Sequence, residues 1–382
     1  MKERLTDVEL LRRLVGFDST SSNSNLPIAD FIADYLHHPA VVIEKFPGPD
    51  ETKTNLMISA GPAVEGIEGL VLSGHLDTVP AVEEGWESEP FQLSERDDKL
   101  FGRGTADMKG FLAVAMNAFA AIDPADLHAP LVLLFTCDEE VGTLGARKFV
   151  ETWPSGRPLP RSCIIGEPTS LLAVRMHKGH LKLRVRTQGR SAHSGYPHLG
   201  INAIDKAAEI LLRLRHLRET LESERSESSV FFGKVPFAPL NVGVIRGGTA
   251  VNIIPDSCDI ELGIRLLPEM KTEAMLDRVR EALSGLDCTV EVINDSPPLL
   301  LRDDAAIYQK ARTLVDQKLD VTVNFATDAG WLQQLGLECT IFGPGSIEVA
   351  HRPNEFIPKQ QLAHAALLMD LLIGDLCLSP SK

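Results

Sequence analysis

The sequence lacks any block of basic residues. Its 38 Lys and Arg residues are outnumbered by 53 Asp and Glu residues, which gives a formal net charge of -15 at pH 7. Nucleic acid and anionic membrane surfaces are polyanions, so an acidic chain without a basic patch is a poor partner for either. We therefore expect a small-molecule substrate, and a cationic one suits the charge.

Cysteine is scarce and shows no useful spacing. Neither a thiolate metal site nor a disulfide framework fits the scattered positions. Several cysteines lie in apolar runs typical of strands, so we expect reduced residues in the core. The six are Cys137, Cys163, Cys258, Cys288, Cys339 and Cys377.

Targeting and membrane signals are also lacking. The N-terminal stretch MKERLTDVELLRRLVGF reads as an amphipathic helix without the apolar centre of a secretory signal, and no run reaches transmembrane length. These features predict a cytoplasmic protein. With 382 residues, of which 44% are hydrophobic, the chain is long enough for a large core in two domains.

A buried strand followed by acids is the most informative stretch. Residues 131–136 are almost all apolar, as in a strand of a parallel sheet, and Asp138, Glu139 and Glu140 follow at once. Ligands bind at the carboxyl ends of such strands, and clustered carboxylates repel one another unless a cation lies among them. A metal ion would meet this need. Alternatively, the acids favour the N-terminus of a helix at residues 146–151.

Other strand and loop ends deliver further candidates. His75 and Asp77 follow a strand at residues 70–73, and their spacing suits a metal-bound imidazole paired with a carboxylate. Asp107, in the glycine-rich GRGTADMKG, is either a helix N-cap or a ligand. This loop lacks the G-K-[ST] order of a phosphate loop, which excludes a nucleotide site of that kind. Glu167 ends the apolar run RSCIIGE.

The combined donor set indicates a catalytic metal pair. Imidazole and several carboxylates without thiolates suit zinc or cobalt in a hydrolytic site, where one carboxylate is shared between two ions. His351 follows a predicted buried strand at residues 339–342 and could complete the set, although a loop histidine is often simply exposed.

The pattern changes after residue 178. LKLRVRTQG alternates between apolar and charged residues, as in a strand with one exposed face. The elements that follow have the order β-α-β-β-α-β of a ferredoxin-like sandwich. We predict a metal-bearing domain of residues 1–178 and 292–382, with residues 179–291 inserted as a lid or dimerisation domain. The expected elements of the insert are helices at residues 201–221 and 272–283 and strands at 240–246, 259–266 and 289–293.

Several motifs, in their order, resemble the M20 family of zinc-dependent amidohydrolases and exopeptidases. They are SGHLDTVP, GRGTADMKG, CDEEVGTLGA, IIGEPTSL, GRSAHSG and GPGSIEVAH, and they span nearly the whole chain. The resemblance implies an α/β zinc-exopeptidase-type catalytic domain with a mostly parallel central sheet, plus an inserted ferredoxin-like α+β lid. It also implies two Zn²⁺ ions per subunit, with Co²⁺ as a possible substitute, and a homodimer formed through the lid.

The resemblance also implies roles for individual residues. The ligands would be His75 and Glu167 on one zinc, Glu140 and His351 on the other, and Asp107 between them. Glu139 would be the general base for metal-activated water, and Asp77 would orient His75. In the lid, His193 would reach a catalytic site, often that of the partner subunit. Asn252 and Arg265 would hold the substrate carboxylate.

Within the family, the length and EPTSLLAVRMHKGH most resemble the branch that hydrolyses N2-acetyl-L-ornithine to acetate and ornithine in arginine biosynthesis. Succinyl-diaminopimelate desuccinylases are close to that branch. Its members usually show Thr-Glu-Ala where this chain has Thr327, Asp328 and Ala329. If this acid reads the distal amine, the shorter Asp328 leaves other N-acyl amino acids open, including acetyl-citrulline and succinyl-diaminopimelate. A dipeptidase and a metal-free binding protein are the remaining alternatives.

Overall fold

The computed structural model describes residues 4–62 and 69–378, which form two compact units. Unit 1 comprises Met1–Arg175, Leu301–Val321 and Thr327–Lys382, and unit 2 comprises Met176–Leu300 and Thr322–Ala326. The predicted insert at residues 179–291 is thus shorter at both ends than unit 2. Each unit has its own hydrophobic core.

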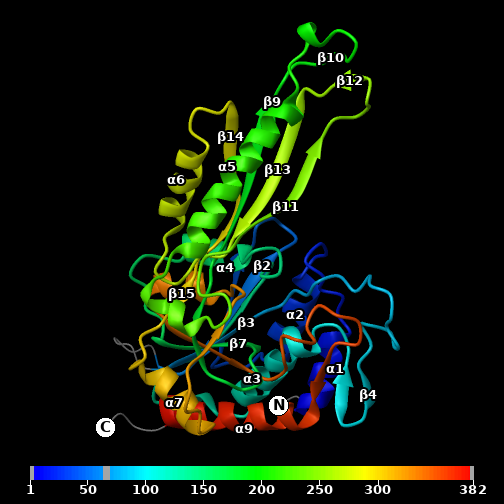
Figure 1. Cartoon of the computed structure of the whole chain (residues 1–382). Coiled ribbons are helices and arrows are strands. Elements are labelled where there is room, and N and C mark those ends of the chain that lie inside the picture. Colours follow the sequence, from blue (N-terminus) through cyan, green and yellow to red (C-terminus); the bar gives the residue numbers. More distant parts are fainter. Residues whose placement is uncertain (1–3, 63–68, 379–382) are drawn as a thin grey trace. The chain divides into compact units, whose positions relative to one another are not determined.

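A sheet that is parallel at its centre organises unit 1 (Figure 1). Its order runs β1-β2-β6-β3-β7-β17-β8, and the neighbours among β6, β3, β7 and β17 pair in parallel. Every residue of β3 and β6 is buried, as expected where helices cover both faces. The strands are β1 (Val42–Pro47), β2 (Thr54–Ala60), β3 (Leu70–His75), β6 (Leu131–Thr136), β7 (Ser162–Pro168), β8 (Val174–His177) and β17 (Glu338–Gly343).

Helices α2, α3, α4, α7 and α8 contact strands of this sheet. α3 is buried along almost its whole length and contacts both α1 and α9. α1 begins with a capping box between Thr6 and Glu9, which satisfies free N–H groups at its start. The helices are α1 (Asp7–Val15), α2 (Leu26–Tyr35), α3 (Gly110–Ala120), α4 (Leu144–Thr152), α7 (Ala306–Leu314), α8 (Ala329–Leu332) and α9 (Lys359–Ile373), with short turns η1 (Thr105–Lys109), η2 (Pro124–Asp126), η5 (Gln333–Leu335) and η6 (Gly374–Leu378).

Unit 1 also contains a small, separate antiparallel sheet. Its order is β18-β5-β4, formed by β4 (Ser94–Arg96), β5 (Lys99–Phe101) and β18 (Phe356–Pro358). It joins the segment after His351 to the segment before Asp107, through pairs such as Phe356 with Phe101.

One helical stretch is long and apolar enough to cross a membrane, judged by length and composition alone. This stretch, Lys359–Leu378, combines α9 with η6. Its length and hydropathy contradict the expectation that no run reaches transmembrane length. Residues along one side of it, including Leu362, Leu368 and Leu372, are buried in the hydrophobic core of unit 1. A helix buried in a protein core can have the same length and apolar composition as a membrane-spanning helix.

Unit 2 contains a four-stranded antiparallel sheet in the order β11-β13-β9-β14. Together with two helices, this is the predicted ferredoxin-like arrangement. β9 shows the predicted alternation, because Leu181, Leu183 and Val185 are buried. The elements are β9 (His180–Gln188), α5 (Ala203–Ser223), β11 (Leu240–Gly247), β13 (Ser257–Ile264), α6 (Thr272–Ala282) and β14 (Cys288–Ser296).

Several short elements in unit 2 were not predicted. β10 (Ala192–His193) pairs with β12 (Ile253–Ile254) as a separate two-stranded sheet. β15 (Leu299–Leu300) pairs with Met176 and His177, the last two residues of β8, which belong to unit 2. β16 (Val321–Val323), whose last two residues also belong to unit 2, pairs with β8. The remaining turns are η3 (Pro197–Leu199) and η4 (Glu227–Phe231).

Candidate metal centre

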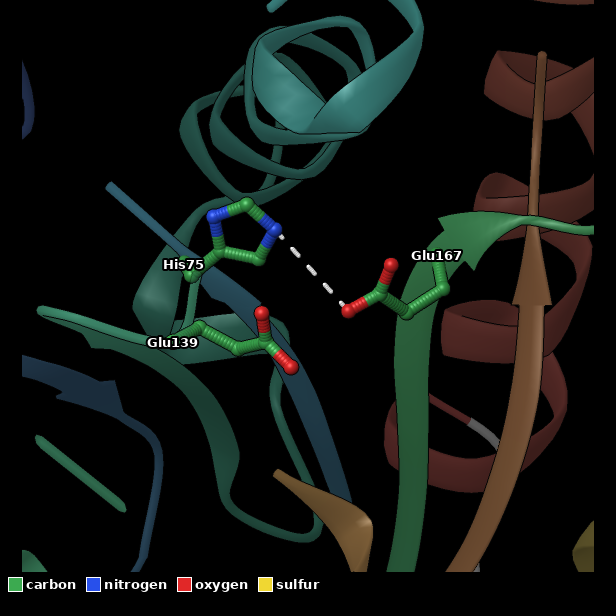
Figure 2. Close-up of side chains that lie close together, drawn as sticks. All are labelled: His75, Glu139 and Glu167. Carbon is green, nitrogen blue, oxygen red and sulfur yellow. Dashed lines mark ion pairs between the residues drawn. The ribbon is translucent and has the colours of Figure 1, made fainter. Parts of the chain in front are cut away.

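The carboxyl edge of the parallel sheet gathers the predicted ligands of unit 1. His75 ends β3, Glu139 and Glu140 follow β6, and Glu167 lies near the end of β7. Figure 2 shows the side chains of His75, Glu139 and Glu167 pointing toward one another. Parallel strands end at the same edge, so residues far apart in the sequence meet there.

The two histidines lie on either side of Asp107. The Nε2 atom of His75 is 3.0 Å from Asp107 Oδ1 and 3.9 Å from Glu167 Oε1. The Nε2 atom of His351 is 3.3 Å from Asp107 Oδ2 and 3.0 Å from Glu140 Oε2. Each oxygen of Asp107 therefore faces a different imidazole, and each imidazole faces a different glutamate.

Burial sets the electrostatics of this cluster. It raises the pKa of Glu139 and of Glu167 well above the usual value, and the charges of Glu167 and Asp107, respectively, add to the effect. Burial also raises the pKa of Glu140 to about 7. For Asp107 burial acts in the same sense, but hydrogen bonds with His351 and His75 lower its pKa overall. The site thus holds carboxylates that are hard to ionise together, which is what a bound cation would relieve.

The two histidines of the cluster have raised pKa values. Burial alone would lower the pKa of His75, but its hydrogen bond with Asp107 and nearby carboxylates raise it well above the usual value. Hydrogen bonds with Asp107 and Glu140 raise the pKa of His351 to about 10. Imidazole and carboxylate donors without thiolate suit zinc or cobalt. Among the residues that the structure describes, two groups have donor atoms within 4.8 Å of one another: His75 with Glu139 and Glu167, and His75 with Asp107 and Glu140.

Asp77 contacts His75 differently from what the H-x-D spacing suggests. The Nδ1 atom of His75 lies 2.9 Å from the backbone oxygen of Asp77 and 3.6 Å from the carboxylate oxygen Oδ1. The carboxylate instead accepts hydrogen bonds from the backbone N–H groups of Glu139 and Glu140, at 3.1 and 3.2 Å. It also accepts a hydrogen bond from the hydroxyl of Ser21. The Asp77 carboxylate therefore holds the backbone of the acidic turn, while the backbone oxygen and the Oδ1 atom of Asp77 lie near His75.

Asp138, in the turn between β6 and Glu139, forms an ion pair with a lysine. Asp138 has a φ of 51°, a left-handed conformation that Asp tolerates better than most residues. Its Oδ1 atom accepts a hydrogen bond from Lys53 Nζ at 2.7 Å, and both side chains are almost fully buried. Lys53 also donates to the backbone oxygen of Ser21. This pair joins the turn to the segment that supplies the Ser21 hydroxyl.

Asp328 is buried just before α8, with 2% of its surface exposed. Its Oδ2 atom accepts a hydrogen bond from the hydroxyl of Thr136, the last residue of β6. Its Oδ1 atom has no hydrogen-bond partner among the described residues. Burial raises the pKa of Asp328 to about 6. This acid thus lies at the end of β6, the strand that precedes Glu139.

The predicted residues of unit 2 fall in two places within that unit. His193 is exposed in β10 next to the segment of Asn252, whose backbone oxygen accepts a hydrogen bond from Ser194 N–H at 3.0 Å. The Nδ1 atom of His193 accepts a hydrogen bond from Gly195 N–H. Arg265 instead follows β13, and its charge contributes to lowering the pKa of His177, after the larger effect of burial.

Sequence reasoning missed two groups around the metal centre. Neither Ser21 nor Glu355 is among the residues singled out from the sequence. Glu355 is 1% exposed and hydrogen-bonded to the backbone of the Asp107 loop. An acid four residues after His351 in HRPNEF was the available signal, but polar loops commonly contain acids.

The chain matches a protein-family model and curated relatives over most of its length. Residues 71–375 match the model described as peptidase family M20/M25/M40. The acetylornithine deacetylase of Proteus mirabilis is 37% identical over 388 residues, covering 98% of this chain and 97% of that protein. The acetylornithine deacetylase of Myxococcus xanthus is 34% identical, with 96% of each chain covered.

Solved structures with low sequence identity share the fold. An M20 family metallo-carboxypeptidase from Sulfolobus solfataricus has a TM-score of 0.76 at 17% identity, covering 96% of this chain and 98% of that one. A dinuclear metal-binding M20 peptidase from Bacillus subtilis has a TM-score of 0.66 at 16% identity, with 97% of each chain covered. The matched family model and the extent of these relatives lead to one conclusion. The chain belongs to peptidase family M20/M25/M40.

Proposed function

We propose that this chain is a metal-dependent amidohydrolase that converts N2-acetyl-L-ornithine to acetate and L-ornithine. The observation that carries the proposal is the arrangement around Asp107, whose two oxygens face two imidazoles within 3.3 Å. A carboxylate shared between two ligand sets is the arrangement expected of a hydrolytic metal pair. The deacetylase names of the full-length relatives support the choice of substrate.

In this proposal two Zn²⁺ ions bind, and Co²⁺ can replace them. His75 and Glu167 hold one ion, Glu140 and His351 hold the other, and Asp107 is common to both. When bound, the ions polarise the amide carbonyl and make water a nucleophile near neutral pH. The short distances among these side chains and the raised pKa values of the glutamates support this assignment.

Glu139 is the proposed general base. Its carboxylate takes a proton from the attacking water and then gives it to the departing α-nitrogen. Burial raises its pKa, which brings its proton affinity closer to that needed near neutral pH. The Asp77 carboxylate fixes the backbone of Glu139 through its N–H, so the base is held on a rigid turn.

Residues of unit 2 complete the proposal. His193 would stabilise the oxyanion that forms at the carbonyl, and Asn252 and Arg265 would bind the substrate carboxylate. We propose unit 2 as a lid and as the dimerisation domain of a homodimer, in which His193 serves the partner's site. The six free cysteines support a reducing compartment, which we propose to be the cytoplasm.

Asp328 is the proposed reader of the distal amine of the substrate. Its buried Oδ1 atom without a described partner supports this role, because a buried acceptor gains from a donor. Truncation to Ala should raise KM for N-acetyl-ornithine by about 10- to 100-fold, the effect of losing one hydrogen bond to a charged group. The same change should leave KM for N-acetyl-methionine nearly unaltered.

The deciding experiment measures amine release by the zinc-loaded protein from four substrates side by side. These are N-acetyl-ornithine, N-acetyl-citrulline, N-acetyl-methionine and N-succinyl-diaminopimelate. Preference for N-acetyl-ornithine is the expected result. Preference for another substrate would retain the mechanism but reject the substrate. If none is hydrolysed by protein with two bound metals, cleavage of dipeptides would identify a peptidase.

A further inference from the structure

A buried carboxylate that is not a candidate ligand holds the loop of Asp107. The Oε1 atom of Glu355 accepts hydrogen bonds from the N–H groups of Ala106 and Asp107, at 2.9 and 3.0 Å. Its Oε2 atom accepts from Gly104 N–H at 3.1 Å and from Arg103 Nη1 at 3.0 Å. Four donors therefore converge on one side chain, and three of them belong to the backbone that carries Asp107.

The partner of Glu355 reaches two other segments. Arg103 is 1% exposed, and its Nη2 atom donates to the backbone oxygen of Pro80 and to Glu83 Oε2, both at 3.0 Å. Its Nη1 atom also lies 3.4 Å from the backbone oxygen of Arg352. The guanidinium stacks over the ring of Trp86, with 5.1 Å from its central carbon to the ring centroid.

Each of these segments adjoins a candidate ligand. Pro80 follows His75 and Asp77 in the chain, Arg103 precedes Asp107, and Arg352 is the neighbour of His351. The backbone reinforces the connection, because Gly102 N–H donates to the Glu355 backbone oxygen at 3.0 Å and β5 pairs with β18. The loops that bear two histidines and the shared aspartate thus converge on one ion pair.

We propose that Arg103 and Glu355 form a positioning clamp, which sets the separation of Asp107 from His351 and thereby prepares the metal pair. This inference rests on the proposed use of these residues as ligands. Neither clamp residue is itself a ligand candidate, so each acts through the backbone of others. Because Glu355 bonds to N–H groups on both sides of Ala106, a shift of its carboxylate moves Asp107 directly.

Glu355→Gln tests the clamp with little change of shape. The amide offers one acceptor and one donor, so either Arg103 with Gly104 or Ala106 with Asp107 must meet an N–H group instead of an oxygen. Outer partners of metal ligands change metal affinity by about 10- to 100-fold when altered. We expect a loss of that size for one or both Co²⁺ ions, together with an altered visible absorption spectrum of the cobalt protein.

Two further variants accompany Glu355→Gln, a milder change in the clamp and a control outside it. Arg103→Lys keeps one charge but loses the planar fork, so it should shift cobalt affinity and spectrum in the same direction but less. Glu348→Gln changes an exposed acid on the same loop as His351 and is the matched control, for which we expect wild-type values. Cobalt affinity is measured by chelator competition without substrate, and thermal unfolding of the metal-free proteins reports folding.

The outcomes separate the clamp from the proposed function. Wild-type cobalt affinity and spectrum in folded Glu355→Gln would overturn the clamp, even if turnover fell. If that variant fails to fold, the cobalt affinity and spectrum of Arg103→Lys decide instead, and wild-type values there would overturn the clamp. A wild-type protein that binds two cobalt ions but leaves N-acetyl-ornithine intact would reject the substrate and retain the clamp. A wild-type protein that binds no cobalt would reject both.

Discussion

Three glutamates of unit 1 and two acidic residues of unit 2 show opposite shifts of their pKa values. At the carboxyl edge of the sheet in unit 1, burial raises the pKa values of Glu139, Glu140 and Glu167. On the sheet of unit 2, hydrogen bonds with Arg186 and Arg184 lower the pKa values of Asp259 and Glu261. The acids of unit 2 are paired with arginines of the neighbouring strand β9, whereas those of unit 1 are paired with imidazoles and with one another.

This difference shows how function can be distinguished from surface chemistry in an acidic chain. Exposed carboxylates next to arginines need nothing more, because their charge is already matched and solvated. Buried carboxylates that raise one another's pKa store unfavourable energy, which a ligand can release. Five changes test this distinction, beginning with the largest expected effect.

Glu139→Gln should lower the turnover number by about 10²- to 10⁴-fold, because an amide cannot take the proton of water. Metal content should remain that of the wild type, since the proposed ligands are untouched. Steady-state kinetics and elemental analysis measure the two quantities. Glu151→Gln, at an exposed position on α4, is the control. Retained turnover would remove Glu139 from its role as the base.

Lys53→Met should lower the free energy of unfolding by about 3–5 kcal/mol, because Asp138 is then a buried charge without its partner. Denaturant titration measures the change. Adding Asp138→Asn should recover part of the loss by removing the charge. If the single variant is as stable as the wild type, Asp138 does not need its internal cation and the contrast with the glutamates disappears.

Metal binding at pH 7 should release about one proton or more per subunit. In the metal-free protein the pKa of His351 is about 10 and that of Glu140 is about 7, so protons occupy sites that the metal requires. Calorimetric titration with Zn²⁺ in two buffers of different ionisation enthalpy measures the release. Equal apparent enthalpies in both buffers would contradict it.

The same raised pKa values predict how the metal-free protein responds to pH. Each group stabilises the fold below its ordinary pKa, 4.5 for Glu140 and 6.5 for His351, and that stabilisation is lost as pH rises through about 7 and about 10. The free energy of unfolding should therefore fall across this range. Chemical denaturation at a series of pH values, with and without Zn²⁺, measures the effect.

Arg186→Ala should have the smallest effect on stability. Its fork donates to both oxygens of Asp259, at 2.7 and 3.0 Å, but the pair is exposed. We expect an unchanged denaturation midpoint and a rise in the pKa of Asp259 toward its ordinary value, followed by NMR titration. Arg280→Ala, which removes the exposed partner of Asp277, is the control and should leave the pKa of Asp259 unchanged. A large loss of stability would show that this face is more than solvated surface.

The sequence was most informative where burial imposes a strong pattern. Residues 131–136 were predicted as a buried strand and form β6, because parallel strands covered on both sides must be apolar along their whole length. The acids after β6 and β7 could then be placed at one edge. Alternation likewise predicted β9, since one face of that sheet is open.

Contacts made by the backbone of loops could not be predicted in the same way. The Oδ1 atom of Asp77 lies 3.6 Å from His75 Nδ1, but the hydrogen bonds that the carboxylate accepts from the N–H groups of Glu139 and Glu140 have no signal in the sequence. Glu355 was missed because its partners are N–H groups and an arginine far away in the sequence. Such contacts depend on where loops meet after folding, and no periodicity records this. The two-residue strands β10 and β12 are also too short to leave a pattern.

Unit 1 is built from separate segments of the chain, and this affects its folding during synthesis on the ribosome. Nearly all of unit 2 is made as one continuous segment before β17, His351 and α9 emerge. Until then the edge of β7 lacks its parallel neighbour and α3 lacks one of its covering helices. The nascent chain thus exposes an apolar strand edge, a feature prone to association with other chains. Unit 2 begins later in the chain but should fold before unit 1 is complete. Metal should be acquired only at the end of translation, when His351 has emerged.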